Sequence, residues 1–111
     1  MLLGLARVSG WSMAPTLRDG DRLLVRYDAR PATGDVVVVR LPGGRPLAVK
    51  RAVRHEGGGW WVQRDNPVAG VDSWQVGAIP DEDVLAVALA RVWPWPRLLR
   101  RLRGGRPAVG D

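Results

Sequence analysis

The sequence predicts a single, mainly β domain built from short antiparallel strands. Two observations predict it. Short runs rich in Val, Leu and Trp recur along the chain, and Gly, Pro or Asp residues separate them. The length of 111 residues suits one domain and is too short for two of ordinary size. Hydrophobic residues make up 46% of the chain, which is enough for a buried core and argues against overall disorder.

Five strands are expected, and the segments around them set the domain limits. Gly residues separate the third run from the fourth, so these two are expected to form a hairpin. The segment 67–80 has few strand signals and is expected to be a long loop. After a Trp-Pro-Trp-Pro stretch, residues 97–103 could form two helical turns, and 104–111 resemble a disordered end. The expected folded domain is therefore 1–96, followed by a basic, partly disordered tail, 97–111. The strands are expected at 22–27, 36–41, 47–55, 60–63 and 84–93.

The composition excludes several kinds of chemistry. No cysteine is present, so disulfides and thiolate catalysis are excluded. His55 is the single histidine, and no spacing of histidine and carboxylate residues resembles a metal site. We therefore expect neither a metal nor another cofactor.

The positive charge is concentrated near the end of the chain. The net charge is +6 and the isoelectric point is about 11.4. Residues 91–106 contain six arginines and no acid, which equals the whole net charge. We expect a weak contact of 97–111 with an anionic membrane or an acidic protein, and no specific binding of nucleic acid. A basic binding module without enzymatic activity remains an alternative.

Apolar segments are too short to place the chain in a membrane. The longest, residues 84–90 and 1–6, fall well below the roughly 18–20 residues that a spanning helix needs. Residues 1–6 are also too short for the core of a signal peptide. The sequence therefore predicts a cytoplasmic location.

Lys50 stands out because the other basic residues, out of seventeen, are all arginine. Arginine cannot be deprotonated in a protein, whereas a buried lysine can. Period-two alternation puts Lys50 on one face of its strand with the small residues Ala48 and Ala52. The pKa of a free lysine is near 10.4, so burial must lower it before the amine can act as a base. A chance lysine in an arginine-rich sequence is the alternative.

Ser12 lies in a turn bracketed by Gly10 and Pro15. The apolar side chains of Trp11 and Met13 flank its hydroxyl and can exclude water. Backbone N–H groups of such a turn can face a developing oxyanion. Local chemistry alone is equally compatible with an ordinary turn serine.

Three segments of the chain, in order, resemble the conserved boxes of type I signal peptidases. Residues 12–17 (SMAPTL), followed by Gly20-Asp21, resemble the nucleophile box. Residues 34–38 (GDVVV), followed by 49–51 (VKR), resemble the lysine box. Asp65-Asn66, followed by Asp72-Ser73 and Gly77, resemble the third box.

This resemblance implies a signal-peptidase or repressor-protease-like β fold and a serine endopeptidase with a Ser–Lys dyad. Ser12 would attack the scissile carbonyl, and Lys50 would take the hydroxyl proton. The substrate would bind as an extended strand, with small residues just before the cut. The residues implied for oxyanion binding and positioning are Gly10, Ser12 and Met13, and those implied for support from the third box are Asp65, Asn66, Asp72 and Ser73.

The sequence departs from the family pattern at a few positions. Gly10 replaces a serine whose hydroxyl helps to hold the oxyanion in many members. Gly70 replaces the loop serine that helps to orient the lysine, and Trp74 replaces an arginine that pairs with the position of Asp72. These changes affect how Lys50 and the third box are positioned, and they leave the dyad itself intact.

The features of the chain are most similar to the soluble proteases that mature nickel-type superoxide dismutase. That similarity implies a precursor protein with an N-terminal leader as substrate. A general processing enzyme for exported proteins is the alternative within the family. A self-cleaving repressor-type domain would need a DNA-binding part that the sequence lacks. A Ser-His-Asp hydrolase would need His55, which is expected to face away from Lys50.

Overall fold

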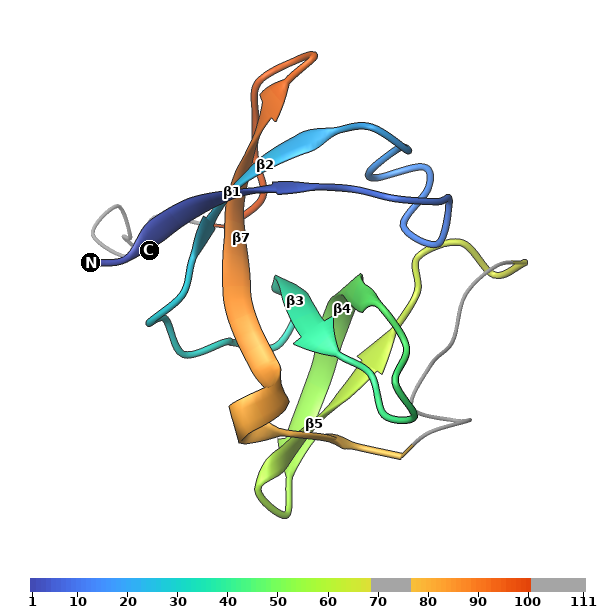
Figure 1. The fold of residues 1–111 in the computed structure, drawn as a ribbon, viewed down its shortest axis with the longest axis vertical. Coiled ribbons are helices and arrows are strands. Elements are labelled where there is room, and N and C mark those ends of the chain that lie inside the picture. The colour runs from blue at the N-terminus through green and yellow to red at the C-terminus, as the bar shows by residue number, and fades with distance from the viewer. Residues whose placement is uncertain (69–76, 101–111) are drawn as a thin grey trace, which may run out of the picture.

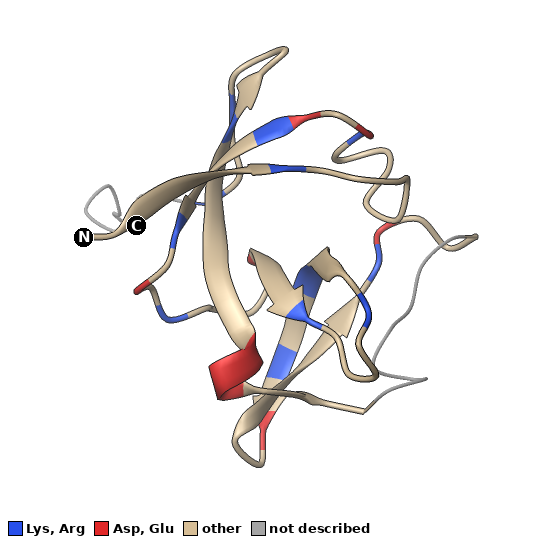
Figure 2. Ribbon diagram, in the orientation of Figure 1, with Lys and Arg blue, Asp and Glu red and all other residues tan. Residues whose placement is uncertain are grey.

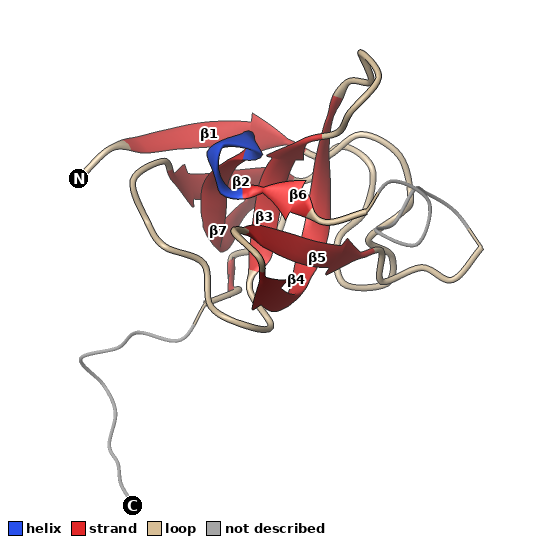
Figure 3. Ribbon diagram, turned by 90° about the horizontal axis from the view of Figure 1, so that it is seen from below, coloured by secondary structure: helices blue, strands red, loops and turns tan. Residues whose placement is uncertain are grey.

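A computed structural model describes residues 1–68 and 77–100, and it contains one strongly curled antiparallel sheet (Figure 1). Figure 3 shows how little helix accompanies the strands. In the described residues the helical content is a single 3₁₀ turn, η1 (Asp81–Asp83), and no helix there is long and apolar enough to cross a bilayer. The strands are β1 (Leu3–Arg7), β2 (Arg22–Arg26), β3 (Val36–Arg40), β4 (Leu47–Glu56), β5 (Gly59–Gln63), β6 (Ile79–Pro80), β7 (Val84–Trp93) and β8 (Arg97–Leu98).

The mainly β fold is confirmed, and all five expected strands are present. Neighbouring strands follow the order β1-β2-β7-β3-β4-β5-β6, and β8 pairs with β7 outside this path. Strand β1 was not predicted because its small residues face the sheet and its large apolar residues face solvent, the reverse of the usual pattern. Its small residues, Gly4 and Ala6, are half-buried against the sheet, whereas Leu3 and Leu5 are exposed. Hydrophobic patterning alone therefore gave no sign of a half-buried strand there.

The core lies on both faces of β3, which explains its run of four valines. Val36 and Val38 belong to one buried cluster, together with Met13 and Leu17 of the loop between β1 and β2. Val37 and Val39 belong to a second buried cluster. A strand covered on both faces shows a continuous apolar run rather than alternation. Each fully buried valine contributes roughly 1.5–3 kcal/mol to folding.

The expectation of helical turns over 97–103 is wrong for the part that the structure describes, 97–100. This part begins with a short strand and contains no helix. Arg97 and Leu98 form β8 and pair with Arg91 and Ala90 of β7. The backbone N–H of Leu99 then donates to Leu89 O at 2.9 Å. Open hydrogen-bonding groups on β7 outweigh the weak helix propensity of a short Leu/Arg segment. The hydrogen bonds of the sheet domain therefore continue past residue 96.

Candidate active site

Lys50 is buried in the middle of β4, with an exposed fraction of 2%. It lies opposite Val37 in the ladder between β3 and β4, so both side chains face the second core cluster. Ala52 is in that cluster and Ala48 packs against it, which confirms the predicted face. Removing an ammonium group from water is costly, and burial therefore favours the neutral amine.

Ser12 lies on the loop between β1 and β2, at the protein surface. Its neighbour Met13 and the nearby Leu17 are almost fully buried and anchor this loop in the first core cluster. Trp11, on the other side, is 57% exposed. Ser12 itself is half-buried. The loop is therefore held from below by its apolar residues and presents Ser12 near solvent, where a peptide can reach it.

The three backbone groups predicted to face an oxyanion differ in the structure. The N–H of Gly10 donates to Asp19 Oδ1 at 2.7 Å, which closes the loop. Gly10 has φ of 84°, a conformation that glycine adopts readily. In contrast, the N–H groups of Ser12 and Met13 have no acceptor within the described residues. These two groups are therefore the ones available to an incoming oxygen.

Asp65, which follows β5, joins the nucleophile segment to the lysine strand. Its Oδ2 accepts a hydrogen bond from Thr16 Oγ1 at 2.7 Å and forms an ion pair with Arg51 Nη2 at 2.6 Å. Arg51 Nε donates to the other oxygen at 3.3 Å. Arg51 Nη1 also donates to Gly34 O at 2.9 Å. One carboxylate thus connects residues from all three predicted boxes.

Asn66 fixes the backbone on both sides of the Ser12 peptide. Its own N–H donates to Ser12 O at 2.8 Å, and its Nδ2 donates to Trp11 O at 2.9 Å. Figure 1 shows the two loops side by side at the right of the molecule. Asn66 therefore positions the nucleophile segment through its backbone and leaves the hydroxyl of Ser12 uninvolved.

The environment of Asp65 favours its ionised form. Partial burial by itself raises the pKa of this carboxyl, but hydrogen bonds from Arg51 and Thr16 and the charge of Arg51 outweigh burial. The net result is a pKa below the ordinary value of 3.8. Since the folded state binds the proton more weakly than the unfolded state, Asp65 stabilises the fold above the unfolded pKa. That stabilisation is lost as the pH falls through the folded pKa.

We expect Asp65→Asn to lower the free energy of unfolding by about 1–3 kcal/mol at neutral pH, because Arg51 loses a charged partner. The loss should shrink when the pH falls below about 4, where the wild-type carboxylate also becomes protonated. Urea unfolding at several pH values measures this. Asp28→Asn, which removes an exposed acid paired with Arg26, is the matched control and should change stability much less than Asp65→Asn. A pH-independent difference for Asp65→Asn would contradict the assignment.

Several predicted residues lie outside the described part of the chain. These are Asp72 and Ser73 of the third box, and the two departures from the family pattern, Gly70 and Trp74. Asp65 and Asn66 are the third-box residues that the structure describes. The roles of Thr16 and Arg51 were not recognised in the sequence, although both lie within the matched boxes. The sequence signal that could have identified them is their position within the boxes, close to Ser12 and Lys50.

His55 pairs with Asp81 at the far end of β4. Its Nε2 lies 2.8 Å from Asp81 Oδ1, and the pair borders a cavity of about 530 Å³ where no described lining residue carries a hydroxyl group. The expectation that His55 faces away from Lys50 is wrong, because a bulge between Ala52 and Arg54 shifts the alternation. His55 instead shares the face of Trp60, about five residues along the strand from Lys50. In the described residues no three acidic or histidine side chains gather as metal ligands.

A groove of about 280 Å³ runs between β1 and the first half of β4. Its walls include Leu5 and Ala6 on one side and Ala48 and Val49 on the other, over a floor of apolar residues from β2, β3 and β7. In the described sheet β1 is an outer strand, and β5 pairs with β4 only from Arg51 onward. Both walls of the groove therefore have backbone groups that an added strand can use.

Comparison with known proteins places these features in a family. The model of the Peptidase S24-like family matches residues 3–88, which spans both the Ser12 loop and the Lys50 strand. The chain belongs to the peptidase S24-like family. This agrees with the curled β fold and supports the predicted resemblance to signal peptidases at the level of the superfamily. The protein is thus a serine peptidase of the signal-peptidase type.

Two relatives of this peptidase are inner membrane proteases. Mitochondrial inner membrane protease subunit 1 of Schizosaccharomyces pombe is 28% identical, over 91% of this chain and 80% of the relative. Mitochondrial ATP-independent inner membrane protease subunit 1a of Arabidopsis thaliana is 31% identical, over 84% of this chain and 72% of the relative. Neither name supports the expected similarity to proteases that mature nickel-type superoxide dismutase.

These relatives also overturn the predicted cytoplasmic location, since both are by name proteases of the mitochondrial inner membrane. The prediction was based on the absence of a long apolar segment. That reasoning was insufficient because a protein can act at a membrane without spanning it.

Proposed function

We propose that this peptidase removes N-terminal leaders from precursor proteins with Ser12 as nucleophile and Lys50 as general base. The family match supports a peptidase of the signal-peptidase type. The observation that carries the proposal further is the burial of Lys50. At 2% exposure, burial disfavours the ammonium form of Lys50, and proton acceptance is a use for the neutral amine.

The proposed reaction has two halves that use the same pair of residues. Lys50 Nζ takes the proton of the Ser12 hydroxyl while the oxygen bonds to the scissile carbonyl carbon. The N–H groups of Ser12 and Met13 stabilise the resulting oxyanion. The C–N bond then breaks, and Lys50 returns the proton to the leaving amine. In the second half Lys50 takes a proton from water, whose oxygen bonds to the carbonyl carbon of the serine ester. The C–O bond to Ser12 then breaks, and Lys50 returns the proton to Ser12 Oγ as the acid leaves.

The groove between β1 and β4 supports an extended peptide as substrate. A peptide that enters it can hydrogen-bond to both walls, as in other cases of strand addition. The groove has a total volume of about 280 Å³, and Ala6 is one of the residues that line it. Small substrate residues therefore suit the positions that face these walls.

We expect Ala6→Ile to reduce kcat/KM for a leader peptide by about tenfold, mainly through KM, because Ala6 packs against the cluster that forms the floor of the groove and the added side chain fills it. Steady-state cleavage of a fluorogenic peptide with small residues before the cut measures this. His55→Ala changes a different cavity and serves as the control, with kcat/KM within about twofold of wild type. An unchanged KM in Ala6→Ile would rule out the groove as the substrate site.

The test of the function is whether the chain shortens a precursor. Co-expression of the wild type or Ser12→Ala with a precursor, followed by mass spectrometry of the intact precursor, reads the presence of the leader. The nickel-type superoxide dismutase precursor is one candidate, and the relatives do not support it specifically. Precursors handled at a membrane are the second, favoured by the names of the relatives. Removal of a leader by both versions of the chain would rule out Ser12 as the nucleophile.

A further inference from the structure

The hairpin formed by β7 and β8 carries an unusual concentration of exposed apolar side chains. Trp95 is 73% exposed, Leu98 66%, Trp93 56% and Val92 42%, all within seven residues. Figure 1 shows this hairpin extending beyond the rest of the sheet at the top of the molecule. Single exposed hydrophobic residues are common, whereas a contiguous group indicates an interaction surface.

Arginines surround the base of this hairpin. A cavity of about 290 Å³ is lined by Arg18, Arg91 and Arg97, together with Trp95. Arg91 is engaged, because it donates to Trp95 O at 2.7 Å and lies 3.4 Å from Asp21 Oδ2. The guanidinium groups of Arg18 and Arg97 have no acceptor among the residues that the structure describes. The cavity is therefore rich in N–H donors, with the nearest carboxylate already paired.

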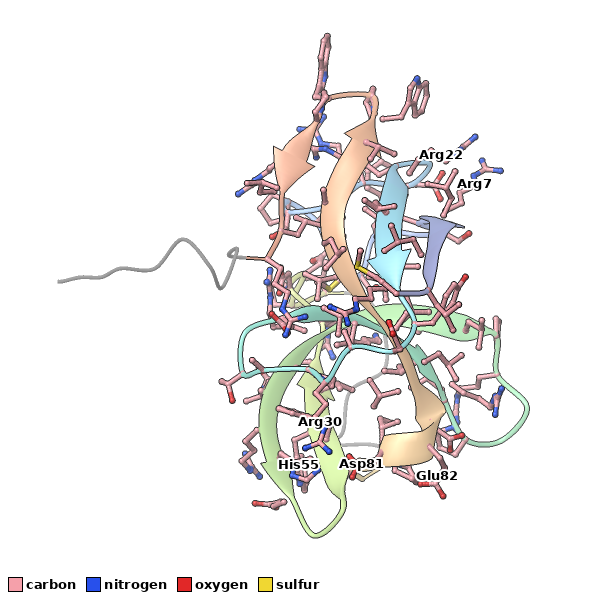
Figure 4. All side chains as sticks on the ribbon, turned by 90° about the vertical axis from the view of Figure 1, so that its left-hand side faces the viewer. Arg7, Arg22, Arg30, His55, Asp81 and Glu82 are labelled. Atoms are coloured by element: carbon pink, nitrogen blue, oxygen red, sulfur yellow. The ribbon has the colours of Figure 1, made fainter. Side chains whose placement is uncertain are left out.

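Two more arginines extend this positive surface along the sheet. Arg7 and Arg22 lie directly opposite each other in the ladder between β1 and β2, and Figure 4 shows both near the hairpin end. Like charges in this arrangement destabilise a sheet, unless an anion lies close by. Arg22 also lies over the ring of Trp93, with 5.3 Å between its carbon Cζ and the ring centroid. The aromatic and cationic groups thus form one continuous surface.

The opposite end of the molecule has a mixed charge pattern. The three acids of η1 gather there, as the red turn in Figure 2 shows, and Figure 4 places Arg30 beside His55 and Asp81. Arg40 also pairs there with Asp83, so positive charge is not in excess as it is at the hairpin. Each end therefore responds differently to a charged surface, which would orient the whole domain.

We propose that the β7–β8 hairpin docks this domain on an anionic lipid bilayer, with a lipid phosphate in the cavity between Arg18 and Arg97. Tryptophans are favoured at the boundary between headgroups and acyl chains, and arginines near the surface attract anionic lipids. Pro15, three residues after Ser12, borders the same cavity. The docked orientation therefore holds the Ser12 loop beside the membrane. Binding requires no catalysis, so the docking is independent of the proposed function.

Cosedimentation of the full chain with lipid vesicles tests this proposal. We expect binding to vesicles of phosphatidylcholine mixed with phosphatidylglycerol, and much weaker binding to phosphatidylcholine alone. The double variant Arg18→Gln/Arg97→Gln should bind about 25-fold more weakly, at roughly fivefold for each arginine. Trp93→Ala/Trp95→Ala should lose about tenfold or more, through lost apolar burial.

Arg30→Gln/Arg45→Gln removes the same charge away from the hairpin and is the matched control. It should bind within about twofold of wild type, because salt screens distant charges. Equal losses in the control and the cavity variant would overturn the proposal. The proposal would also be overturned if binding were lost only in a variant with Arg101, Arg103 and Arg106 changed to glutamine, because the tail would then be the binding element. The chain could instead bind a polyglutamate column through the hairpin and fail to bind vesicles. That result would overturn the proposal and indicate an acidic protein as the partner.

Discussion

Replacing Ser12 by alanine is expected to reduce kcat for peptide cleavage by at least about 10⁴-fold, because the proposed mechanism forms its acyl intermediate on the Ser12 hydroxyl. The fold should be unaffected. The loop is anchored by Met13 and Leu17 and held through the Ser12 carbonyl by Asn66, none of which involves the hydroxyl. Thermal unfolding should therefore give the same Tm as wild type. Cleavage of a leader peptide, followed by mass spectrometry, measures the remaining activity.

Ser9→Ala is the matched control for this variant. Ser9 is an exposed serine three residues earlier on the same loop, and its replacement should leave kcat within about twofold of wild type. If Ser12→Ala retained most of the activity, Ser12 could not be the nucleophile. Covalent labelling with a reactive phosphonate or a β-lactam would then locate the true nucleophile.

Replacing Lys50 by arginine or alanine is expected to reduce kcat by about 10³-fold or more, for two different reasons. Arginine stays protonated and cannot accept the Ser12 proton. It also places a larger charged group at a position 2% exposed, which should lower the free energy of unfolding by about 2–4 kcal/mol. Alanine removes the base and leaves a cavity in its place.

The cavity in Lys50→Ala offers a sharper test than loss of activity. A small primary amine, such as ethylamine, fits the vacated space and can take the Ser12 proton. We expect added amine to restore part of the activity in Lys50→Ala, and to have no effect on Ser12→Ala or on wild type. Cleavage rates against amine concentration measure this. A rise in all three proteins would show a reaction of the amine in solution and would contradict the role of Lys50.

Much of the fold could be predicted from the sequence because its strands are strongly patterned. The four valines of 36–39 are buried on both faces of the sheet, and glycines at 57–59 mark the hairpin between β4 and β5. Strand β1 could not be predicted in this way, since its small residues face inward and its leucines face outward. Strand β8 depends on pairing with β7, a contact that local propensity does not encode.

The sequence by itself determined which groups can do chemistry: one lysine among seventeen basic residues, and a serine in a glycine-proline turn. Only the tertiary structure decided how these groups are held. Lys50 is buried because β3 and the second core cluster cover it. The Ser12 loop is tied to the lysine strand through Asp65, which contacts Thr16 across 49 positions of sequence. Contacts of that range come from the closing of the sheet, and no local pattern specifies them.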